Sequence, residues 1–346
     1  MKVKGLAALK PGGPLESYEL ERRVTGLKDV AFKITHAGIC HSDIHQVREE
    51  WGPALFPMVP GHEIVGLVTE VGSSVSKFRV GDRIGVGVFI DSCRECEPCK
   101  KGMQNYCDQG MTGTYNNLER DGKTPAQGGY SNYFVIDEDY AVHIPENLDL
   151  AGVAPLLCAG ITLYSPIKHW KTGPGKKVGV LGLGGLGHMG VKIAAAMGAD
   201  VTVFSHSPNK KDDALRMGAK EFVVVKNKED LKSESKKYDL ILNTVSANLD
   251  LEWYVECLKL DGTIVLMGLP GEPYSIGTGS LIAQRRSVSG SMIGGIPELQ
   301  EMLNFCGKHS ITSDIELIDP DYINSAYDRT VASDVKYRFV IDAGKF

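Results

Sequence analysis

The chain of 346 residues has no long apolar run and no strong excess of charge of one sign. A helix that crosses a bilayer needs about 20 consecutive apolar residues, and no segment approaches that length. The first residues, MKVKGLAALKPGG, contain too short an apolar segment for a secretory signal. The net charge of −5 gives no electrostatic reason to expect nucleic acid or an anionic membrane as a partner. We therefore expect a cytoplasmic protein.

The chain contains only eight cysteines, too few for a disulfide scaffold. Disulfides are rare in a reducing compartment, so clustered cysteines there indicate metal binding. The composition is otherwise that of a soluble globular protein, with 42% hydrophobic and 23% charged residues. The length allows two ordinary domains.

The pattern of apolar residues changes near residue 160. Before it, short runs such as DVAFKITHAGI and EIVGLVTEVG mix apolar and polar residues, which predicts a mostly antiparallel β domain. After it, KKVGVLGLGGLGHMGVKIAAAMGADVTVFS indicates strand, glycine turn, helix and strand, and YDLILNTV and GTIVLMGLP are typical of a parallel sheet. An amphipathic helix is expected near 297–310, and the final KYRFVID predicts a strand that could return to the first domain.

The segment GLGGLG contains the pattern G-x-G-x-x-G through Gly182, Gly184 and Gly187, with Gly185 between them. The pattern alone is weak, but here it follows a strand and opens a helix, which is the context of a dinucleotide site. Glycine lets the backbone approach a pyrophosphate, and the helix N–H groups favour its charge. The alternative is a tight strand-to-helix turn with no ligand.

The end of the second strand bears on the choice of cofactor. An NAD enzyme usually has Asp or Glu there, which holds the ribose 2′-OH. This chain instead has FSHSPNKK, with Ser205, Ser207 and Lys210. Hydroxyls and an ammonium can bind a 2′-phosphate, which a carboxylate would repel. The segment therefore predicts NADP, and the alternative is that its lysines form a solvated helix start.

Four cysteines lie close together as C-x2-C-x2-C-x7-C, at Cys93, Cys96, Cys99 and Cys107. This set matches a closed tetrahedral zinc site with four thiolate ligands from one loop, at about residues 91–110. A closed site has no position for substrate, so the predicted role is structural. A redox role for C-x-x-C is the alternative.

A second metal site that did chemistry would need an open coordination position. Cys40, His62 and Cys158 are candidate ligands from widely separated segments. Spacing alone does not connect them, because a lone histidine or a buried cysteine usually serves packing.

Taken together, these motifs resemble the zinc-dependent medium-chain alcohol dehydrogenases, specifically the cinnamyl alcohol dehydrogenase branch. The resemblance covers nearly the whole chain and rests on GICHSDIH, PGHEIVG, GDRIGVG, the four-cysteine loop, LCAGITLYSP, GLGGLGHMGVKIA and KYRFVID. It implies a GroES-like catalytic domain at 1–158 and 298–346, split around a Rossmann NADP-binding domain at 159–297. It also implies a homodimer.

By this resemblance Cys40, His62 and Cys158 bind a catalytic zinc, so the chain carries two zinc ions. Asp43 would orient the imidazole of His62. Glu63 lies next to the metal and would enter its coordination sphere when substrate or water leaves, and the sequence leaves open whether it does so at rest.

The resemblance also implies roles for the rest of GICHSDIH. Ser42 and His45 would be the inner and outer ends of a proton relay that includes the cofactor ribose. Histidine suits the outer position because its ordinary pKa is about 6.5. An ordinary surface histidine is the alternative for His45. His41 would face the cofactor pyrophosphate and is not expected to bind zinc.

Further cofactor contacts follow from the same resemblance. They are Thr162 and Leu186 at the nicotinamide ring, Met267 and Gly268 near its ribose and carboxamide, and Arg338 at the pyrophosphate. An ordinary strand end is the alternative for Met267 and Gly268, and a solvated surface residue is the alternative for Arg338. Trp51 would line the substrate pocket and favour aromatic or long-chain aldehydes, with plain core packing as its alternative.

The resemblance thus implies hydride transfer between an alcohol carbon and NADP(H), with zinc holding the substrate oxygen as a Lewis acid. Because cellular NADP is mostly reduced, aldehyde reduction is the expected direction. A polyol dehydrogenase of the same superfamily is one alternative, opposed by Cys158 and Ser205. A non-enzymatic NADPH-binding protein is another, opposed by the intact ligands and relay. The natural substrate stays open.

Overall fold

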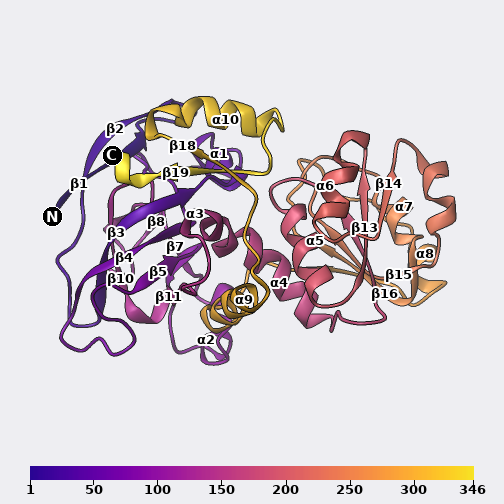
Figure 1. Cartoon of the computed structure of the whole chain (residues 1–346), viewed down its shortest axis with the longest axis horizontal. Helices are drawn as coiled ribbons and strands as arrows, with labels where there is room; N and C mark the ends of the chain where they lie inside the picture. Colours follow the sequence, from indigo (N-terminus) through magenta and orange to yellow (C-terminus); the bar gives the residue numbers. More distant parts are fainter. The chain divides into compact units, whose positions relative to one another are not determined.

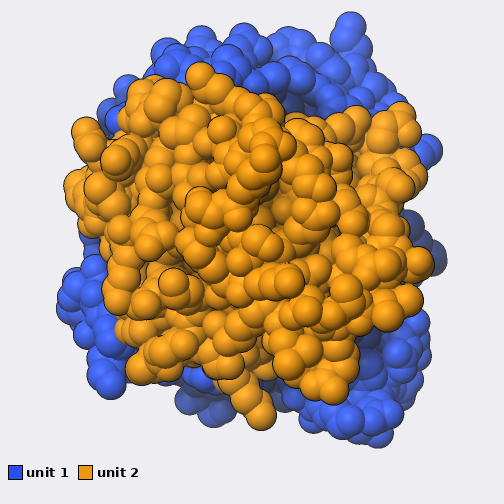
Figure 2. Space-filling view, turned by 90° about the vertical axis from the view of Figure 1, so that its right-hand side faces the viewer, with its two compact units in different colours: residues 1–161, 294–346 blue, residues 162–293 orange.

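The computed structural model describes all 346 residues, which divide into two units (Figure 1). Unit 1 comprises residues 1–161 and 294–346, and unit 2 comprises residues 162–293; Figure 2 distinguishes them by colour. The chain therefore leaves unit 1 within α4 (Ala159–His169) and returns just before α9 (Ile296–His309).

Unit 1 is built on a seven-stranded, mainly antiparallel sheet with the order β11–β5–β4–β3–β19–β18, and β10 also pairs with β3. Its strands are β3 (Asp29–Gly38), β4 (Ile64–Val71), β5 (Arg83–Val86), β10 (Tyr133–Asp137), β11 (Val142–His143), β18 (Ile315–Ile318) and β19 (Arg338–Asp342). The antiparallel β domain predicted from the sequence is confirmed. So is the return of the final strand, because β19 pairs with residues 36–38 of β3.

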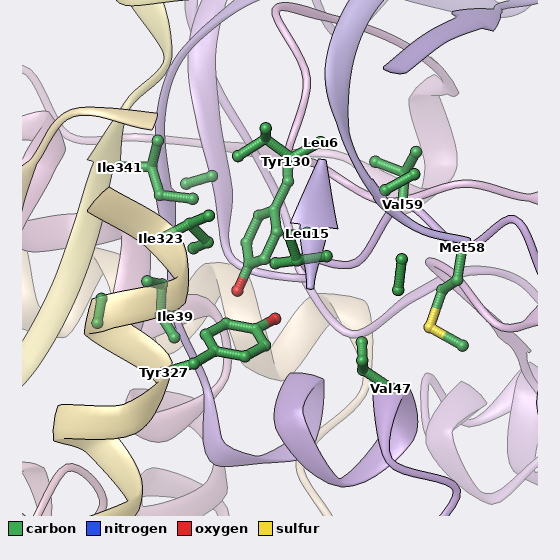
Figure 3. Packing of buried hydrophobic residues seen from close by; sticks show 14 of the residues in the cluster. Leu6, Leu15, Ile39, Val47, Met58, Val59, Tyr130, Ile323, Tyr327 and Ile341 are labelled. Atoms are coloured by element: carbon green, nitrogen blue, oxygen red, sulfur yellow. The ribbon is translucent and has the colours of Figure 1, made fainter. Parts of the chain in front are cut away.

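Three two-stranded sheets and five α-helices lie beside the main sheet in unit 1. The strand pairs are β1 (Lys2–Ala8) with β2 (Leu15–Glu21), β6 (Phe89–Asp91) with β7 (Thr112–Gly113), and β8 (Asn117–Leu118) with β9 (Pro125–Ala126). The helices are α1 (His41–Val47), α2 (Glu97–Lys100), α3 (Leu150–Val153), α9 and α10 (Ile323–Val331). One cluster of buried residues joins β1, β2, α1, α10 and β19 (Figure 3).

Unit 2 is a six-stranded parallel sheet with the order β14–β13–β12–β15–β16–β17. Its strands are β12 (Lys177–Leu181), β13 (Asp200–Ser205), β14 (Glu221–Val224), β15 (Tyr238–Asn243), β16 (Leu258–Leu266) and β17 (Ser287–Gly290). Figure 1 shows α5 (Gly187–Ala196) and α6 (Lys211–Arg216) on one side of the sheet, and α7 (Leu251–Val255) and α8 (Thr278–Ile282) on the other. Because the strand order reverses between β12 and β15, their carboxyl ends form the crevice where doubly wound sheets bind ligands.

No single helix has the length and apolar character needed to cross a membrane. One bent pair, Leu150–Leu157 with Ala159–His169, meets the length and composition test jointly, with a bend of 57°.

Candidate active site and metal centres

Four side chains from three distant segments of unit 1 converge on one point. Cys40 precedes α1, His62 and Glu63 precede β4, and Cys158 precedes α4. Their sulfur, nitrogen and carboxylate atoms all lie within 4.8 Å of one another. The structure therefore brings together the three candidate ligands that sequence spacing could not connect.

The distance between the two thiols fits a metal. Two thiolates bound to one tetrahedral zinc at about 2.3 Å lie about 3.8 Å apart. The Sγ atoms of Cys40 and Cys158 are 3.9 Å apart. Their hydrogen bond, with help from His62, holds the pKa of Cys40 well below its ordinary value despite burial. The thiolate is the form of cysteine that binds metal.

Asp43 orients the imidazole of His62. The Nδ1 atom of His62 lies 3.0 Å from Oδ1 of Asp43, which is fully buried. Asp43 also accepts hydrogen bonds from the backbone N–H groups of Cys40 at 2.9 Å and Gly61 at 3.2 Å. Burial lowers the pKa of His62, but the charge and hydrogen bond of Asp43 outweigh it and raise this pKa. Since Nδ1 carries the proton, Nε2 is left to bind a metal.

The carboxylate of Glu63 belongs to the same cluster as Cys40, His62 and Cys158. Its Oε1 accepts a hydrogen bond of 2.5 Å from Arg338, while its buried Oε2 has no partner. Burial raises the pKa of Glu63 to about 7, against the opposing charge of Arg338. A Cβ atom at Gly38 would lie 2.0 Å from Oε2, so only glycine leaves room for this carboxylate. A buried, unpaired carboxylate oxygen beside two thiols and an imidazole fits a cation.

Arg338 is only 6% exposed, so the alternative of a solvated surface residue is wrong. Its guanidinium also donates to the carbonyl of Ile39 at 2.7 and 3.1 Å. The sequence did not indicate its ion pair with Glu63. Contact with the cofactor pyrophosphate stays a prediction.

Helix α1 carries the remaining residues of GICHSDIH. The Ser42 hydroxyl lies 3.5 Å from Sγ of Cys40. The rings of His41 and His45 are 4.9 Å apart, and Trp51 stacks on His45 at 4.7 Å. Trp51 is 44% exposed, so plain core packing does not describe it.

Sequence reasoning missed Glu50, whose carboxylate forms a short hydrogen bond with Nδ1 of His45. Helix α1 ends at Val47, and Glu49 adopts a left-handed backbone with φ of 55° that turns the chain back. Glu49 is as acidic and as near in sequence, so only the turn decides which carboxylate meets the histidine.

The second centre is the four-cysteine loop. Cys93 and Cys99 have Sγ atoms 3.9 Å apart, and those of Cys96 and Cys107 are 4.0 Å apart. Backbone N–H groups point at two of the sulfurs, from Cys96 to Cys93 and from Cys93 to Cys107. These separations match a zinc ion with four thiolate ligands and no open position.

A buried hydroxyl pair supports this loop. The Ser92 hydroxyl lies 3.1 Å from Sγ of Cys99 and 2.7 Å from the hydroxyl of Tyr140. A zinc-bound thiolate has no proton to donate, so Ser92 must then donate to Cys99 and accept from Tyr140.

In unit 2 the glycine turn joins β12 to α5. Gly182 has φ of +84°, which favours glycine, and a Cβ at Gly187 would lie 2.1 Å from the carbonyl oxygen of Gly182. A Cβ atom at Gly184 would meet nothing within 4 Å, so the space beside the backbone there is open to a ligand. Leu186 occupies the N-cap position of α5 without a side-chain cap, and Gly185 precedes it. This open backbone before a helix fits a pyrophosphate.

The predicted phosphate-binding residues lie after β13. The hydroxyl of Ser205 accepts a hydrogen bond from the N–H of Ser207. The ammonium of Lys210 donates to the carbonyl of Leu183 at 2.9 Å, which ties this segment to the glycine turn. Lys210 is therefore held at the turn and is not part of a freely solvated helix start.

Three more predicted cofactor contacts also belong to unit 2. Thr162 is buried in α4. Met267 and Gly268 follow β16, and the N–H of Met267 bonds the carbonyl of Asn243 at the end of β15. They therefore lie at the carboxyl ends of adjacent strands, where such sheets bind ligands.

Comparison with known proteins agrees with this geometry. Residues 26–146 match the family described as "Alcohol dehydrogenase GroES-like domain", and residues 185–308 match "Zinc-binding dehydrogenase". The chain is 58% identical over 341 residues to "NADP-dependent alcohol dehydrogenase C 1" of Mycolicibacterium smegmatis, covering 98% of this chain and 97% of that protein. It is 52% identical over 344 residues to "Aldehyde reductase YahK" of Escherichia coli, covering 99% and 98%.

A solved cinnamyl alcohol dehydrogenase from Sorghum bicolor superposes with a TM-score of 0.96 at 44% identity, over 99% of this chain and 98% of that one. These relatives agree with the two candidate metal centres and the glycine turn found in the structure. The chain belongs to the zinc-dependent medium-chain alcohol dehydrogenases, in the cinnamyl alcohol dehydrogenase branch.

Proposed function

We propose that the chain reduces aldehydes to primary alcohols with NADPH, at the cluster formed by Cys40, His62 and Cys158. The observation that carries this proposal is the convergence of two thiols, an oriented imidazole and a half-paired carboxylate within 4.8 Å. Cys40, His62 and Cys158 would be three strong zinc ligands. Glu63 would be a weaker fourth ligand, and a substrate oxygen can take its position.

Zinc bound at this cluster supplies Lewis-acid polarisation of the substrate carbonyl. The protein's own part is to fix the ligands. Asp43 holds the tautomer of His62, and Arg338 holds Glu63 beside the ligands without pairing its second oxygen.

Ser42 and His45 are proposed to move the proton that the alcohol oxygen gains or loses. Ser42 lies beside Cys40, and His45 lies one helical turn further along α1. Glu50 would hold the imidazole of His45 in position through its Nδ1 atom. His41 is proposed to contact the cofactor pyrophosphate, as is Arg338.

For the cofactor, we propose that the glycine turn binds the pyrophosphate and that Ser205, Ser207 and Lys210 bind the 2′-phosphate. No carboxylate stands at the end of β13 to repel that phosphate. Thr162, Leu186, Met267 and Gly268 are proposed to contact the nicotinamide end.

Aromatic and medium-chain aldehydes are the proposed substrates. Trp51 offers a partly exposed aromatic face next to His45. The relatives named as an aldehyde reductase and a cinnamyl alcohol dehydrogenase support the same substrate class.

We further propose a homodimer in a reducing compartment such as the cytoplasm. Strand β17 ends the parallel sheet and pairs only with β16, so its outer edge is free to pair with a second copy. All eight cysteines are free thiols, as zinc ligands require.

The test is NADPH oxidation with cinnamaldehyde and benzaldehyde, before and after removal of metal by a chelator, followed by a screen of aldehydes for kcat/KM. Activity should be lost on chelation and return with zinc. Cys40→Ser should remain folded and be inactive. Aldehyde reduction by Cys40→Ser, or by metal-free protein, would overturn the proposal.

A further inference from the structure

Asp43 is linked to a second residue that none of the roles above includes. The hydroxyl of Tyr130 donates to Oδ2 of Asp43 at 2.9 Å, and Tyr130 is fully buried. Oδ1 faces His62. One carboxylate thus connects a phenol to the imidazole, and its orientation depends on donors at both oxygens.

Tyr130 also packs against the backbone that precedes His62. Gly61 has φ of +101°, and a Cβ there would lie 2.5 Å from the Tyr130 ring. The N–H of Tyr130 donates to the carbonyl of Pro60, and the N–H of Gly129 donates to that of Gly61. The ring therefore occupies the space that a side chain at position 61 would take, and it restricts the backbone next to the ligand.

A partly buried arginine, Arg22, holds the segment that carries Tyr130. The guanidinium of Arg22 donates to the carbonyls of Gln127, Gly128 and Tyr133 at 2.6, 2.6 and 3.1 Å. It also stacks over the ring of Phe134 at 4.3 Å. Residues 127–133 are thus fixed on both sides of Tyr130.

A second phenol faces the first. Tyr327 lies on α10, is 7% exposed, and its hydroxyl has no hydrogen-bond partner. Figure 3 shows the hydroxyls of Tyr130 and Tyr327 pointing toward one another. Because the Tyr130 hydroxyl donates its hydrogen bond to Asp43, its oxygen can accept one from the Tyr327 hydroxyl.

We propose that Tyr130 and Tyr327 are positioning residues of the active-site zinc. Tyr327 is placed to donate to Tyr130, Tyr130 donates to Asp43, and Asp43 also accepts from the imidazole of His62. The inference rests on the proposed function, because that imidazole is a proposed ligand. A hydroxyl that accepts a hydrogen bond becomes a stronger donor, so a bond from Tyr327 would strengthen the bond from Tyr130 that holds Asp43 in place. Helix α10, near the C-terminus, thereby supports the metal through its only buried phenol.

The test uses the holoenzyme and the variants Tyr130→Phe, Tyr327→Phe and the double variant. Two measurements are made on each variant. The rate of zinc transfer to a coloured chelator reports how firmly the active-site zinc is held. The visible spectrum of enzyme with cobalt at the active site reports the ligand geometry. Removing an outer partner of a metal ligand costs roughly 10–100-fold in metal affinity. Tyr130→Phe should therefore release the active-site zinc about tenfold faster and lower kcat, with an unchanged KM for NADPH. Tyr327→Phe should show about a threefold effect, and should add nothing in the Tyr130→Phe background.

A matched control is Tyr238→Phe in unit 2, which also removes a buried phenol bonded to a carboxylate, at 2.5 Å from Glu234. It should leave zinc release and the cobalt spectrum unchanged. If Tyr130→Phe lowers only the melting temperature, as the control does, the positioning role is overturned. If Tyr327→Phe acts independently of Tyr130, the proposed bond from Tyr327 to Tyr130 is overturned. Wild-type protein without aldehyde reduction would overturn the proposed function instead.

Discussion

At the scale of single residues, the short helix α1 separates metal binding from proton transfer. Cys40 precedes the helix and faces His62 and Cys158, whereas His45 lies in its last turn and meets Glu50. Loss of Cys40 and loss of His45 should therefore give different defects.

His45→Gln should keep both zinc ions and bind NADPH, because neither needs that imidazole. General acid–base groups contribute roughly 10²–10⁴-fold, and a relay end open to water is partly bypassed, so we expect a loss of alcohol oxidation near the lower limit. Added imidazole should restore part of the rate. Glu50→Gln should give a smaller loss of the same kind, and Glu49→Gln is its control. A zinc ion missing from His45→Gln would show that His45 is a ligand.

The cofactor preference should depend on the residues after β13. Ser205→Asp should raise the KM for NADPH by repulsion and lower that for NADH, since the carboxylate offers the ribose a partner. Lys210→Ala should weaken NADPH more than NADH, because only NADPH has the extra phosphate. Steady-state kinetics with both cofactors measure this. Equal use of NADH and NADPH by the wild type would contradict the assignment.

Side-chain partners that lie far apart in the sequence could not be predicted from spacing. Residues whose partners are local could be assigned from their spacing, but Cys40, His62 and Cys158 were connected only through resemblance to a family. Glu50 and the partner of Arg338 were missed. Both depend on three-dimensional detail, namely a left-handed turn at Glu49 and the pairing of β19 with β3.

At the scale of elements, the four-cysteine loop and the glycine turn were predictable because each is complete within one short segment. The loop's ligands lie between residues 93 and 107, and the turn lies between β12 and α5. The support of the loop by Ser92 and Tyr140 was not predictable, since Tyr140 comes from a separate 3₁₀ turn at Glu138–Tyr140.

Cys99→Ser should lower stability and solubility while the remaining folded protein keeps its active-site zinc. The ligand it removes belongs to a closed site whose binding energy contributes to folding. Thermal unfolding and zinc content measure the effect. Ser92→Ala should release the loop zinc faster without altering kcat, and Ser92→Thr, which retains the hydroxyl, should not. A loss of kcat without loss of stability would contradict a structural role.

At the scale of the whole molecule, the fold class followed from periodicity. Alternating runs predicted the antiparallel sheet of unit 1, and continuous apolar runs predicted the parallel sheet of unit 2. Strand order within each sheet was not readable from those runs, because neighbours such as β3 and β19 are far apart in sequence.

Elemental analysis should give two zinc ions per chain, one for each cluster of ligands. Light scattering should give the mass of a dimer, and a charged substitution on the edge strand, Val288→Lys, should shift it toward the monomer. A stable monomer in the wild type would contradict the proposed pairing of β17. One zinc per chain would contradict the assignment of two sites.

The location of the two ligand sets along the chain also bears on the order in which a newly made molecule acquires its metals. The four-cysteine loop is contained in residues 93–107, so it can capture zinc once that stretch has left the ribosome. The other centre draws on residues 40 to 158 and is backed by Arg338 on β19, much later in the chain. That centre is whole only once β19 has been made and has paired. We therefore expect the loop to bind its metal earlier than the active site does, and zinc shortage late in synthesis should yield folded but inactive protein.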